Sequence, residues 1–167
     1  MSSSWSFRSQ PRRACSREAI AARPPPAREI ESMMRFRVLI VDDYPDAAES
    51  ACVLLTMLGH DCRIALCATD ALVEAGRFVP DVAILDIGLP DLSGFDLARE
   101  LRKRSAGQPL YLAAVTGWGQ PEDRIKAFAA GFNHHILKPA DLTKLKMILE
   151  LAETERSGVT ASGSDRA

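Results

Sequence analysis

Three acidic side chains and one lysine in this chain each come directly after a short run that should form a buried strand. Asp86 follows the apolar run VAIL, and the pair Asp42 and Asp43 follows the run VLIV. Lys138 follows the run HIL and precedes a proline. Parallel strands end at a common edge, where open α/β folds bind ligands, so we expect these four side chains to meet there. Acids gathered at one place repel each other unless a cation joins them, which implies a divalent metal.

These residues suit the formation of an acyl phosphate on a carboxylate. A carboxylate can attack a phosphoryl group only when the negative charge of that group is neutralised, and Mg²⁺ held by the acids would do this. Lys138 would pair with a further phosphoryl oxygen, and Thr116, which ends the apolar run LAAV, adds a hydroxyl. Gly88 and Gly117 leave the backbone open beside the site, so that a phosphoryl group can approach closely.

The segments that position these residues alternate between apolar strands and amphipathic helices. We predict strands at 37–41, 62–66, 82–85, 110–115 and 135–137, and helices at 45–58, 70–76, 94–103 and 121–131, with a last helix after 141. Thr69 is expected to cap the second helix and Asp141 the last one. Five βα units in a row predict an α/β fold: a five-stranded parallel sheet, order 2-1-3-4-5, doubly wound in a three-layer sandwich.

Composition and length bound the domain organisation and the kind of partner. The chain has 167 residues and a formal net charge of −1, so no overall charge favours nucleic acid or a membrane surface. No apolar run approaches the roughly 20 residues of a membrane span. The four cysteines have no zinc-binding spacing and indicate a reducing cytoplasm.

Two tails are expected to flank a single domain. Residues 1–34 are rich in Ser, Arg and Pro, and residues 154–167 in Ser and Gly, so both are predicted to be disordered. Residues 35–153 then form the domain. A start of translation at Met33 or Met34, directly before the first strand, is the alternative reading of the first tail.

Four segments together resemble the signatures of a known family. VDD at 41–43, LDIGLP at 85–90, VTG at 115–117 and LKP at 137–139 look like the four motifs of the response-regulator receiver domain of the CheY-like superfamily, which has a flavodoxin-like fold. The resemblance covers about residues 35–153 and is greatest to the receivers at the C-terminus of hybrid histidine kinases.

The resemblance implies a role for each matching residue. Asp86 would be the phosphoacceptor, Asp43 would bind Mg²⁺ directly, and Asp42 would bind it directly or through water. The backbone carbonyl of Gly88 would be a further metal ligand. Lys138 would contact Asp86 before phosphorylation and the phosphoryl group afterwards.

Further expectations concern the switch from the inactive to the active state. Thr116 would move to bind the phosphoryl group, with the backbone of Gly117 beside it, and the Lys138–Pro139 bond would be cis. His135 stands where the family often has a Tyr or Phe that rotates on activation, which puts the usual aromatic switch in doubt. Trp118 would lie beside the site, as a gate for water or as a packing residue.

The resemblance implies a receiver of a two-component phosphorelay, a single-domain regulator without DNA-binding output and not an enzyme. Its partners would be a histidine kinase or histidine phosphotransfer protein and a protein effector, with no nucleic acid and no membrane. The face formed by the fourth helix, fifth strand and fifth helix could also pair two copies of the chain. Two rivals remain: an aspartyl-phosphate hydrolase, disfavoured because Gly88 replaces its usual second Asp, and a binding module that works without phosphorylation.

Overall fold

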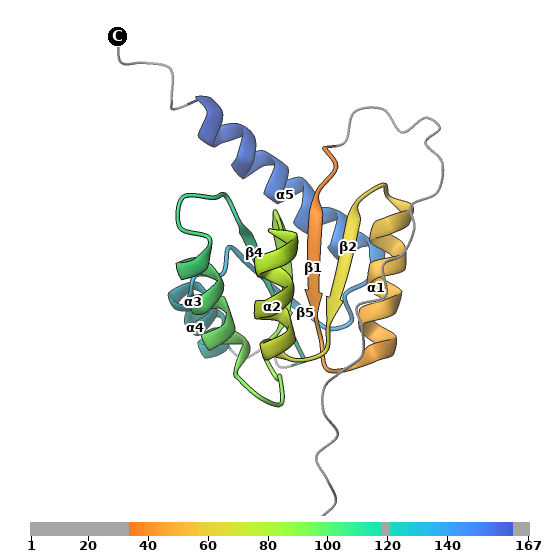
Figure 1. The fold of residues 1–167 in the computed structure, drawn as a ribbon, viewed down its shortest axis with the longest axis vertical. Coiled ribbons are helices and arrows are strands. Elements are labelled where there is room, and N and C mark those ends of the chain that lie inside the picture. The colour runs from red at the N-terminus through yellow and green to blue at the C-terminus, as the bar shows by residue number, and fades with distance from the viewer. Residues whose placement is uncertain (1–33, 118–120, 162–167) are drawn as a thin grey trace, which may run out of the picture.

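The computed structural model describes residues 34–117 and 121–161 and shows a sheet between two layers of helices (Figure 1). The strands are β1 (Arg37–Val41), β2 (Asp61–Ala65), β3 (Val82–Asp86), β4 (Tyr111–Thr116) and β5 (His134–Leu137). The helices are α1 (Pro45–Met57), α2 (Ala68–Phe78), α3 (Gly94–Arg104), α4 (Pro121–Ala130) and α5 (Leu142–Ala161). None of these helices combines the length and apolar character that a bilayer crossing requires.

The sheet is parallel with strand order β2-β1-β3-β4-β5, which confirms the predicted doubly wound topology. Side chains alternate between the two faces along each strand. Val38 and Ile40 of β1 therefore pack with α1 and α5, whereas Leu39 and Val41 pack with α2, α3 and α4. Strands β3 and β4 are buried along their whole length, which explains why their sequences are continuously apolar.

Helix α2 begins at Ala68, two residues before the predicted start, and its cap differs from the predicted one. The side chain of Thr69 does not cap it. Instead, Asp91 of the loop after β3 accepts hydrogen bonds from the backbone N–H groups of Ala68 and Thr69, both at 2.9 Å. Burial raises the pKa of Asp91, but these hydrogen bonds outweigh burial and lower that pKa to about 2. A cap that comes from more than twenty residues away along the chain has no local sequence signal.

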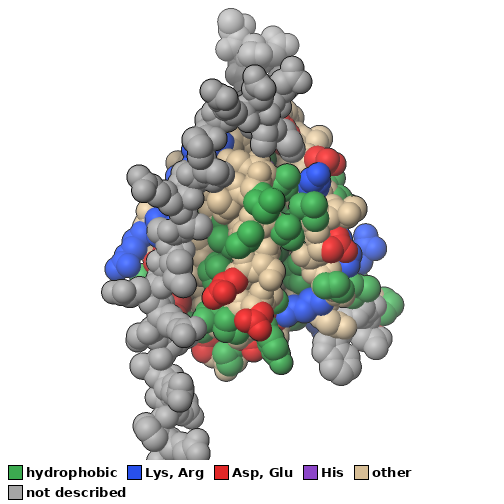
Figure 2. Space-filling model, turned by 90° about the vertical axis from the view of Figure 1, so that its right-hand side faces the viewer, with side chains coloured by type: hydrophobic (Ala, Val, Ile, Leu, Met, Phe, Trp, Pro, Cys, Tyr) green, Lys and Arg blue, Asp and Glu red, His purple; other side chains and the backbone are tan. Residues whose placement is uncertain are grey.

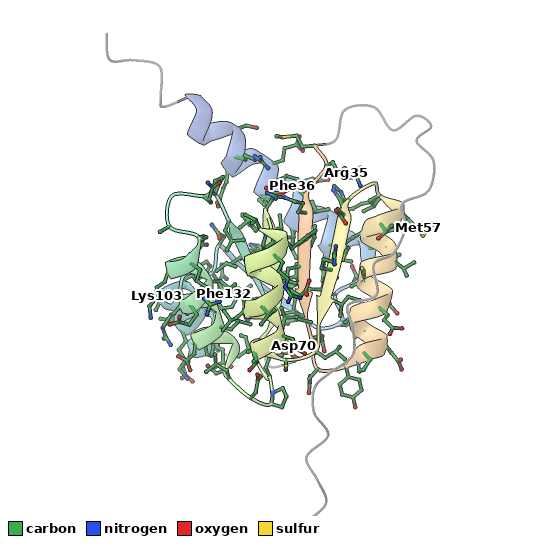
Figure 3. The ribbon with its side chains drawn as sticks, viewed as in Figure 1. Arg35, Phe36, Met57, Asp70, Lys103 and Phe132 are labelled. Atoms are coloured by element: carbon green, nitrogen blue, oxygen red, sulfur yellow. The ribbon has the colours of Figure 1, made fainter. Side chains whose placement is uncertain are left out.

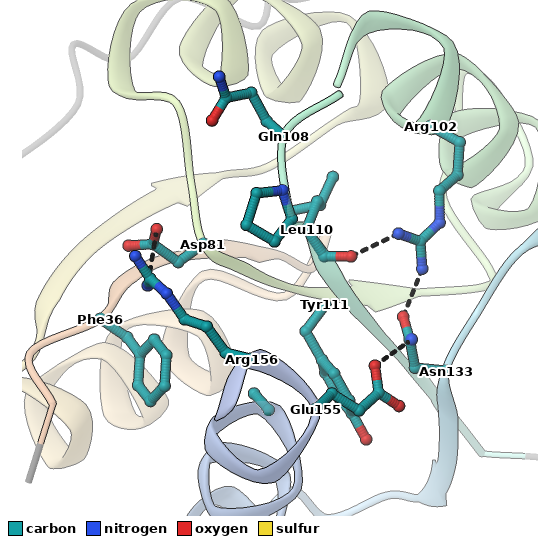
Figure 4. Close-up of a pocket in the computed structure, with 11 residues that line it drawn as sticks. Phe36, Asp81, Arg102, Gln108, Leu110, Tyr111, Asn133, Glu155 and Arg156 are labelled. Atoms are coloured by element: carbon teal, nitrogen blue, oxygen red, sulfur yellow. Dashed lines mark hydrogen bonds and ion pairs between the residues drawn. The ribbon is translucent and has the colours of Figure 1, made fainter. Parts of the chain in front are cut away.

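Helix α5 continues to Ala161, so the predicted tail from residue 154 is wrong for residues 154–161. Arg156 pairs with Asp81 at 3.2 Å, and Glu155 accepts a hydrogen bond from the side-chain amide of Asn133 at 2.8 Å (Figure 4). These contacts surround a cavity of about 210 Å³ at the amino ends of the strands. They hold this part of the helix against the sheet, although the Ser/Gly-rich sequence there does not by itself predict a helix. The rest of the two predicted tails, residues 1–33 and 162–167, lies outside the described residues.

His60 is buried between α1 and β2, where its ring stacks on Phe36 with 5.9 Å between centroids. Phe36 stands with Arg35 at the amino end of β1 (Figure 3). Nδ1 of His60 accepts a hydrogen bond from the backbone N–H of Phe36 at 3.3 Å, and Nε2 has no partner among the described residues. Burial first, and then the charge of Arg35, lower the pKa of His60. The folded protein therefore holds this ring neutral.

We predict that the free energy of unfolding falls as the pH drops below about 6.5, the ordinary pKa of histidine. Below that pH the unfolded chain binds a proton at His60 that the buried ring of the folded protein does not bind. The loss in the free energy of unfolding therefore grows as the pH falls, until the pH reaches the lowered pKa of His60 in the folded protein. Urea unfolding at several pH values should show this slope, and the slope should be flatter in His60→Gln. His134→Gln is the comparison: burial and then Arg124 also lower the pKa of His134, but its ring is less buried, so this variant should flatten the slope less than His60→Gln does. Equal slopes in wild type and His60→Gln would show that the buried His60 ring does not cause this pH dependence.

Candidate functional site

Four strands end at one edge of the sheet and bring the predicted polar residues together there. The register aligns Val41 with Leu85, so Asp42 and Asp86 follow neighbouring positions of β1 and β3. On the other side of β3, Thr116 ends β4 opposite Leu137 of β5. Asp42, Asp86 and Thr116 are buried, with 8%, 7% and 5% of their surface exposed. Polar groups buried this deeply are normally paired, so the partners of these side chains determine what the site can do.

The three acids form one cluster. One carboxylate oxygen of each of Asp42, Asp43 and Asp86 lies within 4.8 Å of the others, and only Asp43 is exposed. Three carboxylates with one side open to solvent fit Mg²⁺, which prefers oxygen ligands, keeps several waters and binds few carboxylates directly. The predicted acids are therefore placed to hold this ion. The carbonyl of Gly88 as a ligand stays a prediction, whereas its N–H donates to Oδ1 of Asp86 at 2.9 Å.

Lys138 bridges the two buried acids. Its Nζ lies 2.6 Å from Oδ2 of Asp86 and 3.0 Å from Oδ2 of Asp42. Burial alone would lower the pKa of Lys138, but hydrogen bonds and charges of Asp86 and Asp42 outweigh it, so the pKa is raised. The ammonium group is therefore charged throughout the physiological pH range and is the only cation in contact with these acids among the described residues.

The loop that carries Lys138 is held by a residue that the sequence analysis missed. The Lys138–Pro139 bond is cis, as predicted. Nζ of Lys144 donates to the carbonyls of Leu137 and Pro139, both at 2.8 Å. The backbone N–H of Lys144 in turn donates to Asp141, which confirms Asp141 as the cap of α5. Lys144 stands three residues after the predicted cap Asp141, and this position in the first turn of the helix is the sequence feature that could have identified it.

The loop after Asp86 packs tightly against the start of α3. The N–H of Gly94 donates to the carbonyl of Ile87 at 3.0 Å. A Cβ at position 94 would lie 2.4 Å from the carbonyl oxygen of Asp86 and 2.7 Å from Cα of Ile87. Only glycine at position 94 allows α3 to pack this closely against the backbone of Asp86 and Ile87.

Gly94→Ala is accordingly expected to destabilise the protein by about 1–3 kcal/mol, because backbone atoms must move to admit the methyl group. Gly76→Ala is the matched control: no atom lies within 4 Å of a Cβ there, and alanine should stabilise this exposed position of α2 by up to about 1 kcal/mol. Urea unfolding of both variants measures the difference. Equal effects at the two positions would show that the contact with Asp86 does not constrain the loop.

The other predicted residues of the site differ in how closely they are packed. A Cβ at Gly117 would meet no atom within 4 Å, and one at Gly88 would meet only Oδ1 of Asp86, at 3.7 Å, so the backbone at both positions is open. His135 is half-buried, and its Nε2 has no hydrogen-bond partner within the described part of the chain. Burial chiefly, and Arg124 next, lower its pKa, so the ring is neutral at pH 7. Trp118 lies outside the described residues.

An apolar groove of about 570 Å³ leads away from the acids between α1 and the start of α5. Asp42, Asp86 and Lys138 line one end of it, and Leu54 and Ala140 are among its apolar walls. Figure 2 views the side of the molecule on which α1 lies and shows hydrophobic side chains gathered there, with acids near one end. The exposed hydrophobic residues of α1 and its N-cap are Tyr44, Val53 and Met57, and Met57 extends away from the sheet (Figure 3).

Known proteins resemble this chain over most of the described fold. The family model described as "Response regulator receiver domain" matches residues 38–150. The "Probable transcriptional regulatory protein TcrX" of Mycobacterium tuberculosis is 36% identical over 127 residues, which are 76% of this chain and 53% of that relative. An uncharacterized 14.6 kDa protein of Leptolyngbya boryana is 29% identical over 72% of this chain and 92% of its own length. The chain thus spans about half of TcrX and nearly all of the smaller protein.

Solved structures of two proteins are also similar to this chain. A receiver domain (CheY-like) from Methylobacillus flagellatus is 32% identical with a TM-score of 0.63, and covers 71% of this chain and 99% of its own. A receiver domain protein (CheY-like) from Methanospirillum hungatei is 29% identical with a TM-score of 0.64, and covers 73% of this chain and 99% of its own.

Proposed function

This chain belongs to the response-regulator receiver domain family, and on that premise we propose that Asp86 accepts a phosphoryl group from a phosphohistidine donor. One observation carries the proposal: Nζ of Lys138 contacts both Asp86 and Asp42, and the Asp43 carboxylate lies within 4.8 Å of both acids. The proposed nucleophile, a cation for the phosphoryl group and the acids proposed to hold the metal would thus lie together before any donor arrives.

The residues of the site divide the reaction between them. An oxygen of Asp86 attacks phosphorus, the bond from phosphorus to the histidine nitrogen breaks, and that nitrogen keeps the electron pair. Mg²⁺ held by Asp42, Asp43 and Asp86 would neutralise phosphoryl oxygens and allow the carboxylate to approach. The N–H of Gly88, 2.9 Å from Oδ1 of Asp86, orients the carboxylate. Lys138 then moves its hydrogen bond from Asp86 to a phosphoryl oxygen.

The end of β4 supports the same reaction. Thr116 is buried beside β5, and its carbonyl accepts the backbone N–H of Lys138 at 2.8 Å, which couples the two strand ends. Gly117 is exposed with an open backbone. The hydroxyl and this backbone would bind the remaining phosphoryl oxygens.

We propose a histidine kinase or a histidine phosphotransfer protein as the donor, docked over α1. The apolar groove along α1 ends at Asp86 and Lys138, so a helix seated there would present its phosphohistidine to the nucleophile. Exposed Val53 and Met57 extend the apolar surface along the helix. Output would leave through protein contacts of α4, β5 and α5, where Ile125, Phe128 and Leu137 are exposed, and two copies could pair there.

The same proposal disfavours turnover of an external substrate. Aspartyl-phosphate hydrolases use a second acid two residues after the nucleophile, and Gly88 stands at that position. The protein would act in the cytoplasm, where its donor is made and where its described cysteines, none of which is in a disulfide, stay reduced.

Incubation with phosphoramidate, which has the P–N bond of phosphohistidine, tests the proposal by intact mass. We expect one phosphoryl adduct that forms with Mg²⁺, is lost when a chelator is present, and is removed by hydroxylamine as an acyl phosphate should be. Circular dichroism provides the control for folding. A folded protein that gains no adduct at any Mg²⁺ concentration would contradict the proposal.

A further inference from the structure

Lys144 of α5 holds the backbone on both sides of Lys138. Its Nζ lies 2.8 Å from the carbonyl oxygen of Leu137 and 2.8 Å from the carbonyl oxygen of Pro139. The backbone N–H of Lys138 itself donates to the carbonyl of Thr116 at 2.8 Å. Hydrogen bonds from two elements, α5 and β4, therefore fix the backbone from which the Lys138 side chain starts.

The first turn of α5, which carries Lys144, is anchored to the rest of the fold. The backbone N–H of Lys144 donates to Oδ1 of Asp141 at 3.0 Å, and its Nζ lies 4.0 Å from Oδ2 of the same carboxylate. The next residue, Leu145, is fully buried in the core on the α1/α5 side of the sheet. A side chain on such an anchored helix can hold a neighbouring loop in one geometry.

Helix propensity does not explain a lysine at this position. The third residue of a helix favours Glu or Gln, and the positive end of the helix dipole disfavours a cation there. Lysine side chains are also mostly exposed in folded proteins, whereas that of Lys144 is 31% exposed. The two carbonyl contacts offset these costs, so the residue is better explained by the loop it holds than by the helix it belongs to.

We propose that Lys144 is a positioning residue of the phosphoacceptor site: by fixing the carbonyls on either side of Lys138, it directs the Lys138 ammonium group at Asp86 and Asp42. That ammonium group lies 2.6 Å from Oδ2 of Asp86 and 3.0 Å from Oδ2 of Asp42. In the described part of the chain, the ammonium group of Lys144 contacts the two carbonyls and the carboxylate of Asp141. It therefore acts on the two acids of the site through Lys138.

Loss of the Lys144 contacts has two consequences of opposite sign. A Lys138 ammonium group that is held less firmly competes less for Asp86 and Asp42, so Mg²⁺ binds these acids more tightly. The same freedom leaves the phosphoryl group without a well-placed cation, so phosphoryl transfer becomes slower. The second consequence rests on the proposed function, whereas the first does not. A general loosening of the site would instead weaken metal binding and transfer together.

Two measurements on Lys144→Met in the full chain test the proposal. A titration with Mg²⁺, followed by the NMR shifts of backbone amides, should give a dissociation constant about fivefold lower than that of the wild type. The rate of adduct formation from phosphoramidate, followed by intact mass, should fall about tenfold. Lys144→Arg, whose guanidinium can donate to both carbonyls, should restore both values. Lys146→Met removes the same charge from an exposed position of α5 and should resemble the wild type.

The Lys138→Met background separates positioning from a direct effect of charge on the metal. There, Lys144→Met should tighten Mg²⁺ binding no more than Lys146→Met does, because the ammonium group it positions is absent.

An unchanged or weaker affinity of Lys144→Met for Mg²⁺, or equal tightening with and without Lys138, would overturn the proposal. If the wild type gains no phosphoryl adduct, the proposed function fails, and the Mg²⁺ titrations alone decide on Lys144. Circular dichroism checks folding, and Lys144→Gln, which also lacks the charge, replaces Lys144→Met if that variant does not fold.

Discussion

Asp86→Asn is expected to abolish phosphoryl transfer from phosphoramidate, so that the intact mass stays unchanged where the wild type gains one phosphoryl group. The amide has nearly the shape of the carboxylate, but it is neutral and a far weaker nucleophile toward phosphorus. It also removes one of the three carboxylates that lie within 4.8 Å of each other, which weakens the metal site. The loss should therefore be complete within the detection limit of the measurement.

Asp46→Asn is the matched control for this variant. Asp46 lies in the first turn of α1, near the site along the sequence, but it is exposed and outside the acid cluster. Its variant should be phosphorylated like the wild type. A phosphoryl adduct on folded Asp86→Asn, with the same dependence on Mg²⁺, would mean that another residue is the acceptor.

Lys138→Met should have the second-largest effect, on both stability and metal dependence. Without the ammonium group, Asp86 and Asp42 lose a partner at 2.6 and 3.0 Å and face each other as buried charges. We expect a loss of about 2 kcal/mol in metal-free buffer, less than a fully buried pair costs, because the Lys138 side chain is 31% exposed. Mg²⁺ would replace the missing cation and recover much of this stability.

Urea unfolding with and without Mg²⁺ measures this effect. The gain in stability on adding Mg²⁺ should be larger in Lys138→Met than in the wild type, where the lysine competes with the metal for the same acids. Lys146→Met, at an exposed position of α5, should behave like the wild type. An equal gain in wild type and Lys138→Met would refute the view that the lysine and the metal share these acids.

The sheet and its site were predictable because both depend on local patterns. Continuous apolar runs specify buried parallel strands, and a polar residue directly after each run, such as Asp86 or Lys138, must lie at the carboxyl edge of the sheet. The order of the strands follows from few allowed crossovers. The acid cluster and the lysine contact then follow from strand register, which places Asp42 beside Asp86.

Features that depend on distant contacts were not predictable in the same way. The cap of α2 comes from Asp91, and the last turns of α5 are held by the pairing of Arg156 with Asp81. Lys144 reads as a surface charge until the cis Lys138–Pro139 loop brings two carbonyls to its ammonium group. The first two contacts join segments that are far apart in the sequence, whereas the Lys144 contacts span only seven and five residues and depend on the conformation of the loop.

The position of the phosphoryl group on the chain is the most direct test of the whole account. Borohydride reduces an aspartyl phosphate to homoserine, which survives digestion and can be located by peptide sequencing in a mass spectrometer. After treatment with phosphoramidate and Mg²⁺, the account predicts homoserine at position 86 and at no other aspartate. Homoserine at Asp42 or Asp43, or a phosphoryl group retained on a histidine or serine, would contradict it.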